Sequence, residues 1–537
     1  MWVSMRRSVP IQLPLTLLLL LLLLCQTASA FDYELKLALN NRLHLQKNTI
    51  ERLLRYSEER QLYDTRNYLA PYRNNVQYGL SASAQLKLEA NDWFSVELAI
   101  DSGEMRPIGR LPQPVVVPLP DKVAAYLPDP IAQSTRDERR YLSNGQPFAD
   151  EAEETYFIRQ ASLRFAIPET EWLSVEIGRM VSSVGSNLIY NDSALGIGVV
   201  IDLEPTKDIP LRFSLQALLP TRTWNSGLSS PLVELKGEYL LSFMESVGLS
   251  FTFYHDGDDN FGQHFVPSIS EAAAVLWPDT VNSSAGYQSL IATLLGTAQP
   301  SDGNVFWLSL SGNKLFGDFS LAATFVLEFG SLRLGNPFYQ IEQLSQSAPE
   351  LYLTLPNSIP KDPVLNFDTL GFAVDLSFQY LVRESMAVGA FFLFLSGADN
   401  PYVRAKDDGY GSFLAVLPFV THTNLFFSGG LNETFSGRQL SNAGINGRGV
   451  VALGPTFQWE PIESLALGST AAALFSPIPS LYGGQFYGVE FDFQGAYDII
   501  DYVRVSLEYD FLVAGDFFSR EGVVHQILVG LDLSYER

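Results

Sequence analysis

The sequence predicts an all-β protein, a transmembrane antiparallel β-barrel of about 18 strands with short periplasmic turns and long extracellular loops. Stretches of alternating apolar and polar residues recur in eight pairs, each joined by a tight turn, and long segments separate the pairs. Beyond residue 30 no apolar run approaches a membrane-spanning helix, although hydrophobic residues make up 47% of the chain and charged residues only 18%. Together these features are typical of a barrel with an apolar outside and a wet inside.

The clearest pair of stretches covers residues 488–494 and 503–511. Successive side chains of a strand point to opposite faces, so Phe491 and Phe493 lie on one face and Asp492 lies on the other. One such pair would suit the half-buried sheet of a soluble protein. Repetition along the whole chain favours a sheet with lipid on one face and water on the other.

The expected strands follow in order, beginning with 33–45. The eight hairpins are 76–89 with 93–101, 156–167 with 172–180, 195–203 with 211–219, 232–241 with 249–254, 305–312 with 319–329, 369–381 with 386–395, 450–459 with 465–475, and 488–494 with 503–511. Their turns are filled by Asn, Asp, Pro, Gly and Ser, which tolerate tight backbone geometry.

A last strand over 523–536 makes the count 18, and an even count places both termini and the tight turns on the periplasmic side. A β-sandwich would not sort its connections by length in this way. Residues 413–417 and 424–428 are candidates for one further hairpin, which would either project outside or add two strands.

The N-terminal 30 residues have the features of a cleaved secretory signal peptide. Arg6 and Arg7 precede an apolar stretch, and Ala28-Ser29-Ala30 supplies the small residues of a cleavage site. We therefore expect residues 1–30 to be removed and 31–537 to form a single barrel domain in the bacterial outer membrane. A single membrane anchor is the alternative, but the apolar core is short for one. A lipoprotein signal at Cys25 is another, but Leu24 stands where a small residue is wanted.

The composition excludes several classes of function. Cys25 is the only cysteine, so the mature chain would have no disulfide and no catalytic thiol. The formal net charge is -24, and loss of Arg6 and Arg7 with the signal takes it to -26, which excludes nucleic acid as a partner. The expected partners are outer-membrane lipid, the barrel-insertion machinery and a hydrophilic solute or a polysaccharide.

With the apolar face assigned to lipid, the residues of the other face are expected to line the pore. The acidic ones are Glu97, Asp101, Glu176, Glu234, Glu238, Asp375, Glu490, Asp492, Glu508, Asp510 and Asp532, and the basic ones are Arg164, Arg212, Lys236 and Arg504. Most of them pair with neighbours in the simplest interpretation. Collectively, the acidic excess predicts a preference for cations or neutral solutes. One hypothesis places Arg504 across the lumen from Glu490 or Asp492, where it would set up a transverse field.

Three of the long segments have distinctive patterns. Residues 257–303 contain two apolar runs that would pack on each other above the barrel or fold inward as a constriction. Residues 111–130 are rich in proline and predict a stiff lid. Residues 49–63 have helical spacing and predict a short helix.

The chain resembles large outer-membrane porins of the alginate-export type. The resemblance lies in Val175-Glu176-Ile177-Gly178-Arg179, followed by Gly185, Asn191-Asp192 and Gly196, and in the rhythm of 488–497 and 502–517. It implies a monomeric barrel of eighteen strands that passes small solutes or exports a polysaccharide, with Gly178 and Arg179 near the constriction. An exporter of an anionic polymer is expected to carry arginines in its lumen, and the acid-rich wall of this chain departs from that. Gly530-x-x-Leu533-x-Tyr535 looks like the terminal signal for the insertion machinery, without its final aromatic residue.

An enzyme is the alternative from a different class. His255, Asp256 and Asp258 cluster at the outer end of an expected strand, where they would suit a barrel-rim hydrolase or a Ca²⁺ site. A solvated acidic turn is the simpler interpretation. Elsewhere no cofactor motif or metal-ligand spacing stands out, so we expect a channel without catalytic residues, cofactor or metal.

Overall fold

The computed structural model describes residues 32–47, 55–57, 62–64, 74–91, 94–107, 156–166, 172–204, 209–220, 230–242, 245–257, 261–262, 265, 300–339, 362–402, 409–416, 418–420, 422–427, 443–480, 483–518 and 522–536. Within these residues, no helix has both the length and the apolar character needed to span a bilayer.

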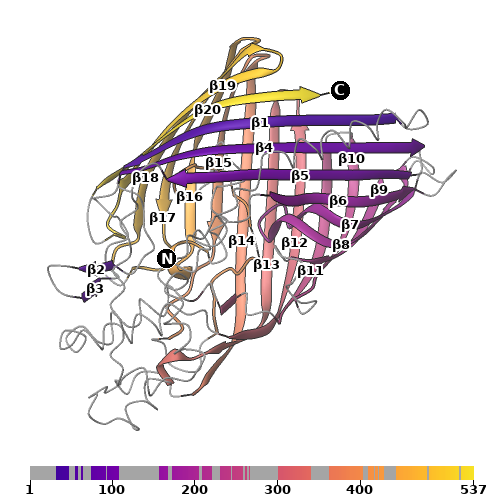
Figure 1. Cartoon of the computed structure of the whole chain (residues 1–537). Coiled ribbons are helices and arrows are strands. Elements are labelled where there is room, and N and C mark those ends of the chain that lie inside the picture. Colours follow the sequence, from indigo (N-terminus) through magenta and orange to yellow (C-terminus); the bar gives the residue numbers. More distant parts are fainter. Residues whose placement is uncertain are drawn as a thin grey trace, which may run out of the picture.

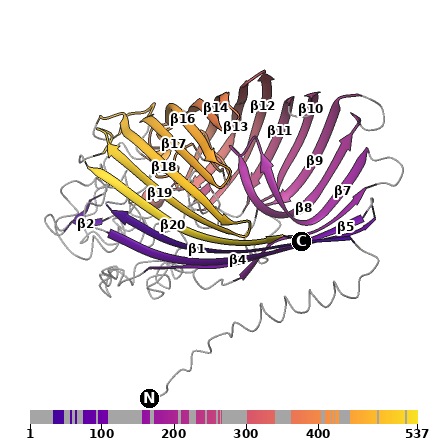
Figure 2. The same cartoon turned by 90° about the horizontal axis from the view of Figure 1, so that it is seen from above.

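Eighteen strands form one closed antiparallel sheet, because β1 pairs with β4 on one side and with β20 on the other (Figures 1 and 2). The strands are β1 (Asp32–Lys47), β4 (Asn74–Asn91), β5 (Phe94–Pro107), β6 (Tyr156–Ala166), β7 (Leu173–Val184), β8 (Tyr190–Asp202), β9 (Leu211–Leu219), β10 (Leu232–Ser242), β11 (Glu245–Asp256), β12 (Ser301–Phe316), β13 (Phe319–Gly335), β14 (Val364–Arg383), β15 (Met386–Leu395), β16 (Val450–Ile462), β17 (Leu465–Phe475), β18 (Phe486–Ile500), β19 (Val503–Ala514) and β20 (Val523–Glu536). The predicted count, order and pairing are confirmed.

In Figure 1, β1, β4 and β5 run across the view while β12, β13 and β14 run almost perpendicular to them. Strands of a closed barrel tilt by about 45° to its axis, so front and back walls cross at a large angle. Several strands are also longer than a bilayer needs. β14 has 20 residues, whereas about 9–11 tilted residues cross a membrane. The wall therefore continues beyond the lipid.

The outer face of the barrel is apolar, as predicted. Leu507 is 55% exposed, and the next residue along β19, Glu508, is fully buried inside the barrel. Trp459 and Tyr502 are exposed beside the tight turns, where aromatic residues form an interfacial girdle. A closed sheet leaves no unpaired strand edge, which is what allows it to sit in hydrocarbon.

Not every expected outer connection is long. Residues 185–189 alone link β7 to β8, so the expectation of a long outer loop is wrong there. This turn is tight because Gly185, Ser186 and Asn187 all adopt positive φ, at 59°, 53° and 72°. The short helix expected over 49–63 is also wrong where the structure describes that segment. β2 (Arg55–Ser57) and β3 (Leu62–Asp64) pair there as a small antiparallel hairpin.

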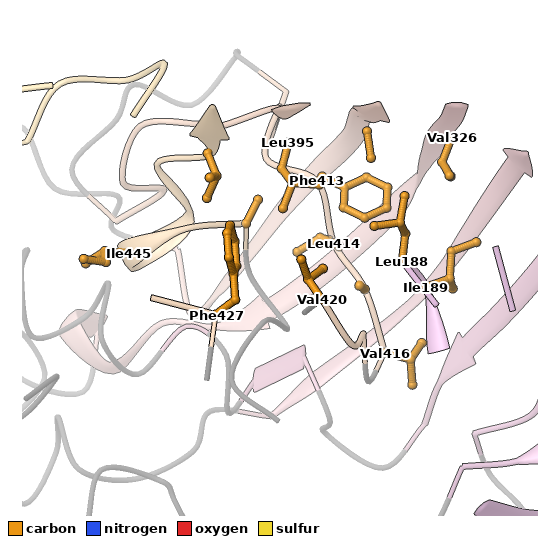
Figure 3. Packing of buried hydrophobic residues seen from close by; sticks show 14 of the residues in the cluster. Leu188, Ile189, Val326, Leu395, Phe413, Leu414, Val416, Val420, Phe427 and Ile445 are labelled. Atoms are coloured by element: carbon orange, nitrogen blue, oxygen red, sulfur yellow. The ribbon is translucent and has the colours of Figure 1, made fainter. Parts of the chain in front are cut away.

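The extracellular half of the barrel interior is an apolar core. Val305, Trp307, Val326 and Leu332 point inward and are completely buried, although a wet lumen was expected at these positions. They are covered by residues 396–449, the connection between β15 and β16, whose described parts fold into the barrel (Figure 3). A sheet with lipid on its outer face and packed side chains on its inner face can be apolar on both faces. The alternation of residues in the sequence does not predict this.

A loop folded into the barrel as the candidate functional site

We call residues 396–449 the inner loop. It includes both candidate hairpin segments, 413–417 and 424–428, and none of their described residues forms a barrel strand. The hairpin interpretation is therefore wrong. The loop does not project outside either: Phe413, Leu414 and Phe427 are buried in the core. The segment 257–303 was expected either to pack above the barrel or to fold inward, and its two apolar runs lie outside the described residues. Its described Phe261 and Phe265 join the same core.

The first anchor of the inner loop is on β12 and β13. Glu328 accepts a hydrogen bond from the backbone N–H of Leu414 at 2.6 Å, and the indole N–H of Trp307 donates to the Leu414 carbonyl at 3.1 Å. Glu328 and Trp307 are fully buried. Nearby, Gly371 allows the loop to approach the wall, because a Cβ there would lie 2.8 Å from the Cα of Phe413. This clamp fixes both backbone groups of one loop residue.

The second anchor is the short β7–β8 turn. The N–H of Val416 donates to the Ile189 carbonyl at 2.9 Å, and the N–H of Phe419 donates to the Asn187 carbonyl at 2.9 Å. In the closed strand order, β7 and β8 are separated from β15 by β9 to β14. The inner loop therefore crosses the barrel interior from one wall toward another.

The third anchor is Glu490 on β18, whose carboxylate binds the returning chain. It accepts hydrogen bonds from the N–H of Leu425 at 2.5 Å, the N–H of Phe426 at 3.0 Å and the hydroxyl of Thr423 at 3.0 Å. They satisfy the buried carboxylate and the loop backbone together.

Asn424 connects the same segment to two further carboxylates. Its backbone N–H donates to Asp492 at 3.3 Å, and its side-chain amide donates to Asp510 at 3.2 Å. Asp492 and Asp510 are directly opposite each other on β18 and β19, and Gln526 of β20 also donates to Asp510 at 3.2 Å. The acidic wall expected to face water is thus packed under the inner loop at these positions.

His422 lies at the lower side of the inner loop, toward the tight-turn end of the barrel. Its Nε2 is 2.8 Å from a carboxylate oxygen of Asp375, one of the predicted wall residues. Its ring stacks on Phe391, with centroids 4.5 Å apart and planes 5° apart. The imidazole is therefore fixed in both position and orientation.

Below His422 is a cavity of about 510 Å³. It is lined by the turn-side halves of β12 to β18, among them Gln379, Gln458 and Thr470. The amide of Gln379 donates to that of Gln458 at 3.0 Å across the cavity wall. This polar cavity and the inner loop above it are the candidate functional site.

The other predicted wall residues are spread along the barrel, and several form ion pairs or hydrogen bonds. Arg212 pairs with Asp202 at 2.5 Å, Lys236 with Glu238 at 2.6 Å and Arg504 with Asp498 at 2.6 Å, while Glu97 accepts from Gln85 and Arg164 is opposite Glu176 in the register. Glu234 and Arg179 are buried, and Arg179 donates to Ser193 at 3.0 Å. Asp532 is opposite Arg504 in the register, and the side chain of Asp101 lies outside the described residues.

The transverse-field hypothesis for Arg504 is wrong. Arg504 binds Asp498 through two nitrogens beside the β18–β19 turn, whereas Glu490 is opposite Leu512 near the other end of the same pair of strands. The residue that a side chain meets depends on its position along the strand as well as on the face it occupies. The hypothesis considered only the face.

The rim cluster does not assemble as an enzyme site where it is described. His255 and Asp256 are consecutive on β11, so their side chains point to opposite faces. Asp256 is buried and accepts from the N–H of Phe261 and the hydroxyl of Ser301, while Asp258 lies outside the described residues. Over the described part of the chain, no group of three His, Cys, Asp or Glu could hold a metal ion.

Glu328, Trp307, His422 and Asn424 were not predicted as site residues. Glu328 carried a usable signal, since it is the only acidic residue of β13 and lies on the inner face of that strand. Trp307 has the same placement on β12. His422 and Asn424 lie in a segment without periodicity, and nothing in the sequence tied them to the wall.

The closed sheet, its exposed apolar belt and its polar interior sites define the class, a transmembrane β-barrel of the bacterial outer membrane. No protein-family model and no curated protein matches the chain.

Solved porins resemble the structure at low sequence identity. OccK8 (OprE) of Pseudomonas aeruginosa is 13% identical with a TM-score of 0.47, covering 94% of this chain and 98% of that one. OccAB4 of Acinetobacter baumannii is 8% identical with a TM-score of 0.46, covering 94% and 98%. A BenF-like porin from Pseudomonas fluorescens Pf-5 is 8% identical with a TM-score of 0.46, covering 94% and 99%. The likeness concerns the course of the barrel and says nothing about the solute.

Proposed function

We propose that this chain is an outer-membrane porin that passes small hydrophilic solutes, with the inner loop as its constriction. The observation that carries the proposal is the attachment of one loop to three separate parts of the barrel wall through buried hydrogen bonds. A loop fixed in this way narrows the lumen and limits the size of what passes. Long loops on a rigid scaffold commonly carry function in this manner.

The open passage runs along the strands that the inner loop does not reach. The described contacts of the inner loop are with β7–β8, β12–β15 and β18–β19. On the inner face of β1 and β4, Lys36 pairs with Glu34 and Lys87 pairs with Glu89, and these four side chains are 39–48% exposed. Charged groups exposed inside a barrel are the expected lining of a water-filled route.

The solute we favour is small and either neutral or cationic. Glu490, Asp492 and Asp510 are buried under the inner loop, so this preference rests on the chain as a whole, whose formal net charge of -24 would repel anions from the barrel. An anionic polysaccharide, which the alginate-export resemblance implies, would have to thread past both that charge and the loop. We therefore do not favour polymer export.

Planar-bilayer recording tests the proposal. The purified protein should form ohmic channels, and a salt gradient should give a reversal potential of the sign for cation preference. Replacing residues 409–427 by a short Gly-Ser linker should raise the single-channel conductance severalfold, because the constriction is removed.

A matched control replaces residues 221–229, between β9 and β10, by a linker of the same kind. Conductance should stay near the wild-type value, because none of the inner-loop hydrogen bonds described above is made with β9 or β10. A folded, membrane-inserted wild-type protein with no conductance would contradict the porin proposal. Clear anion selectivity would reject only the solute preference.

A further inference from the structure

The cavity below His422 has a wall with one kind of chemistry. Six inward positions of this wall, on β13, β14, β16 and β17, carry a hydroxyl or a carboxamide: Ser320, Ser377, Gln379, Thr456, Gln458 and Thr470. Among the residues that the structure describes, no carboxylate side chain lines the cavity. The one lysine at its edge, Lys314, has its ammonium bound to Glu245 at 3.0 Å. The wall therefore offers many neutral donors and acceptors without a free charge.

These groups form an ordered row across neighbouring strands. In the register, Ser320 is opposite Gln379, Gln379 is opposite Gly389, Gly389 is opposite Thr456, and Thr456 is opposite Thr470. Neighbouring strands are about 4.8 Å apart, so the row presents a polar group at each such step, except at one position. That position is Gly389, where a Cβ would lie 2.6 Å from the hydroxyl of Thr456, so the missing side chain keeps the row open.

The inner loop adds a directed group to the top of this cavity. His422 and Phe391 both line it, and the histidine is held by Asp375 through Nε2 and by the Phe391 ring. Among the described residues, no partner is found for the other ring nitrogen, Nδ1. A fixed imidazole edge beside a phenyl ring provides a polar contact and an apolar contact at one place, which suits a molecule with both hydroxyls and C–H faces.

Building on the proposed function, we propose that this cavity binds an uncharged, hydroxyl-rich solute of the sugar or polyol class on its way through the barrel. An anion would need arginine or lysine donors, and a cation would need carboxylates. The lining has neither available. Hydroxyl and amide groups instead give up hydrogen bonds to water and form hydrogen bonds to the hydroxyls of the solute. The net gain in free energy is small, so the solute binds and is readily released.

The test is block of the ion current by maltotriose added on the tight-turn side, with gluconate and choline as charged probes. Maltotriose should reduce the current with a saturable dependence on concentration, and the charged probes should not. The double variant Gln379→Leu with Thr470→Val should raise the half-blocking concentration about three- to tenfold, since each removes one hydrogen-bonding partner. His422→Leu should raise it in the same direction.

Ser309→Ala is the matched control, because Ser309 is an inward hydroxyl of β12 outside the cavity lining, and it should leave the block unchanged. Channels that conduct but show no block by maltotriose, or equal block by gluconate, would overturn the sugar-site proposal while leaving the porin proposal standing.

Calorimetric titration of the detergent-purified protein with maltotriose tests the site independently of conduction. Binding that the double variant weakens would support the site even in a barrel that carries no current. Absence of binding in the wild-type protein would reject the site.

Discussion

The carboxylate of Glu490 on β18 accepts the backbone N–H of Leu425 at 2.5 Å, across a separation of 65 residues in sequence. Glu490 lies on the inner face of β18, and it thus holds a loop that connects two earlier strands, β15 and β16. This bond, repeated for Phe426, makes the wall and the constriction a single unit. The stability of the constriction should therefore depend on wall residues as much as on the loop itself.

Replacing Glu490 by alanine should release the inner loop. Two backbone N–H groups would lose their acceptor, and each buried unpaired group costs roughly 1–3 kcal/mol. Single-channel recordings of Glu490→Ala should show larger and noisier conductance than wild type. Glu490→Gln keeps one acceptor oxygen and should show a smaller change. Glu238→Ala, which removes an acid from a part-exposed ion pair, is the control, and a Glu490→Ala channel as quiet as that control would contradict the anchoring role.

Gly371→Ala should disturb the inner loop although it adds only one methyl group. The new Cβ would lie 2.7 Å from a carboxylate oxygen of Glu328 and 2.8 Å from the Cα of Phe413. Glu328 is hydrogen-bonded to Leu414, the residue after Phe413, so neither group can move away without the other. We expect a lower thermal midpoint in detergent and altered conductance. The matched substitution is Gly198→Ala, whose Cβ would meet only Met180 Sδ at 3.7 Å. Equal behaviour of the two variants would show that the loop is not packed against β14 in this way.

A positive charge on the outer face should block membrane insertion, whereas the same charge on the inner face should not. Leu507 is 55% exposed on the outer face, and a lysine or arginine there costs up to about 2–4 kcal/mol in lipid, depending on depth. Leu507→Arg should reduce the heat-modifiable, folded fraction on gels of outer-membrane preparations. Gln494→Arg, on the inner face of the neighbouring strand, should insert normally. Normal insertion of both would remove the basis for the lipid-facing assignment.

Arg504→Ala should leave ion selectivity near its wild-type value. Arg504 and Asp498 are paired at 2.6 Å beside a tight turn, with their side chains 56% and 38% exposed, and such exposed pairs contribute about 0–1 kcal/mol. The reversal potential should therefore shift little, and the thermal midpoint should fall only slightly. A large shift toward cations would mean that Arg504 acts on the permeating ion and would restore the field hypothesis.

The sequence determined the barrel because successive side chains of a strand point to opposite faces, and one face meets lipid while the other meets the barrel interior. Phe491, Asp492 and Phe493 alternate since lipid and the barrel interior select opposite side chains at successive positions. Strand number, pairing and the outward belt follow from this local pattern and from the tight turns. Helical spacing over 49–63 misled because a short amphipathic pattern does not exclude the β2–β3 hairpin found there.

Only the tertiary structure decided what the inward residues meet. Glu490 and Glu34 have the same strand pattern around them, yet the first is buried under Leu425 and Phe426 and the second is exposed to the lumen. Alternation says which face a side chain occupies and nothing about whether water or another segment fills the space beyond it. Whether water or another segment fills that space depends on contacts such as the hydrogen bond between Glu328 and Leu414. These residues are 86 positions apart, and such a contact has no local signal in the sequence.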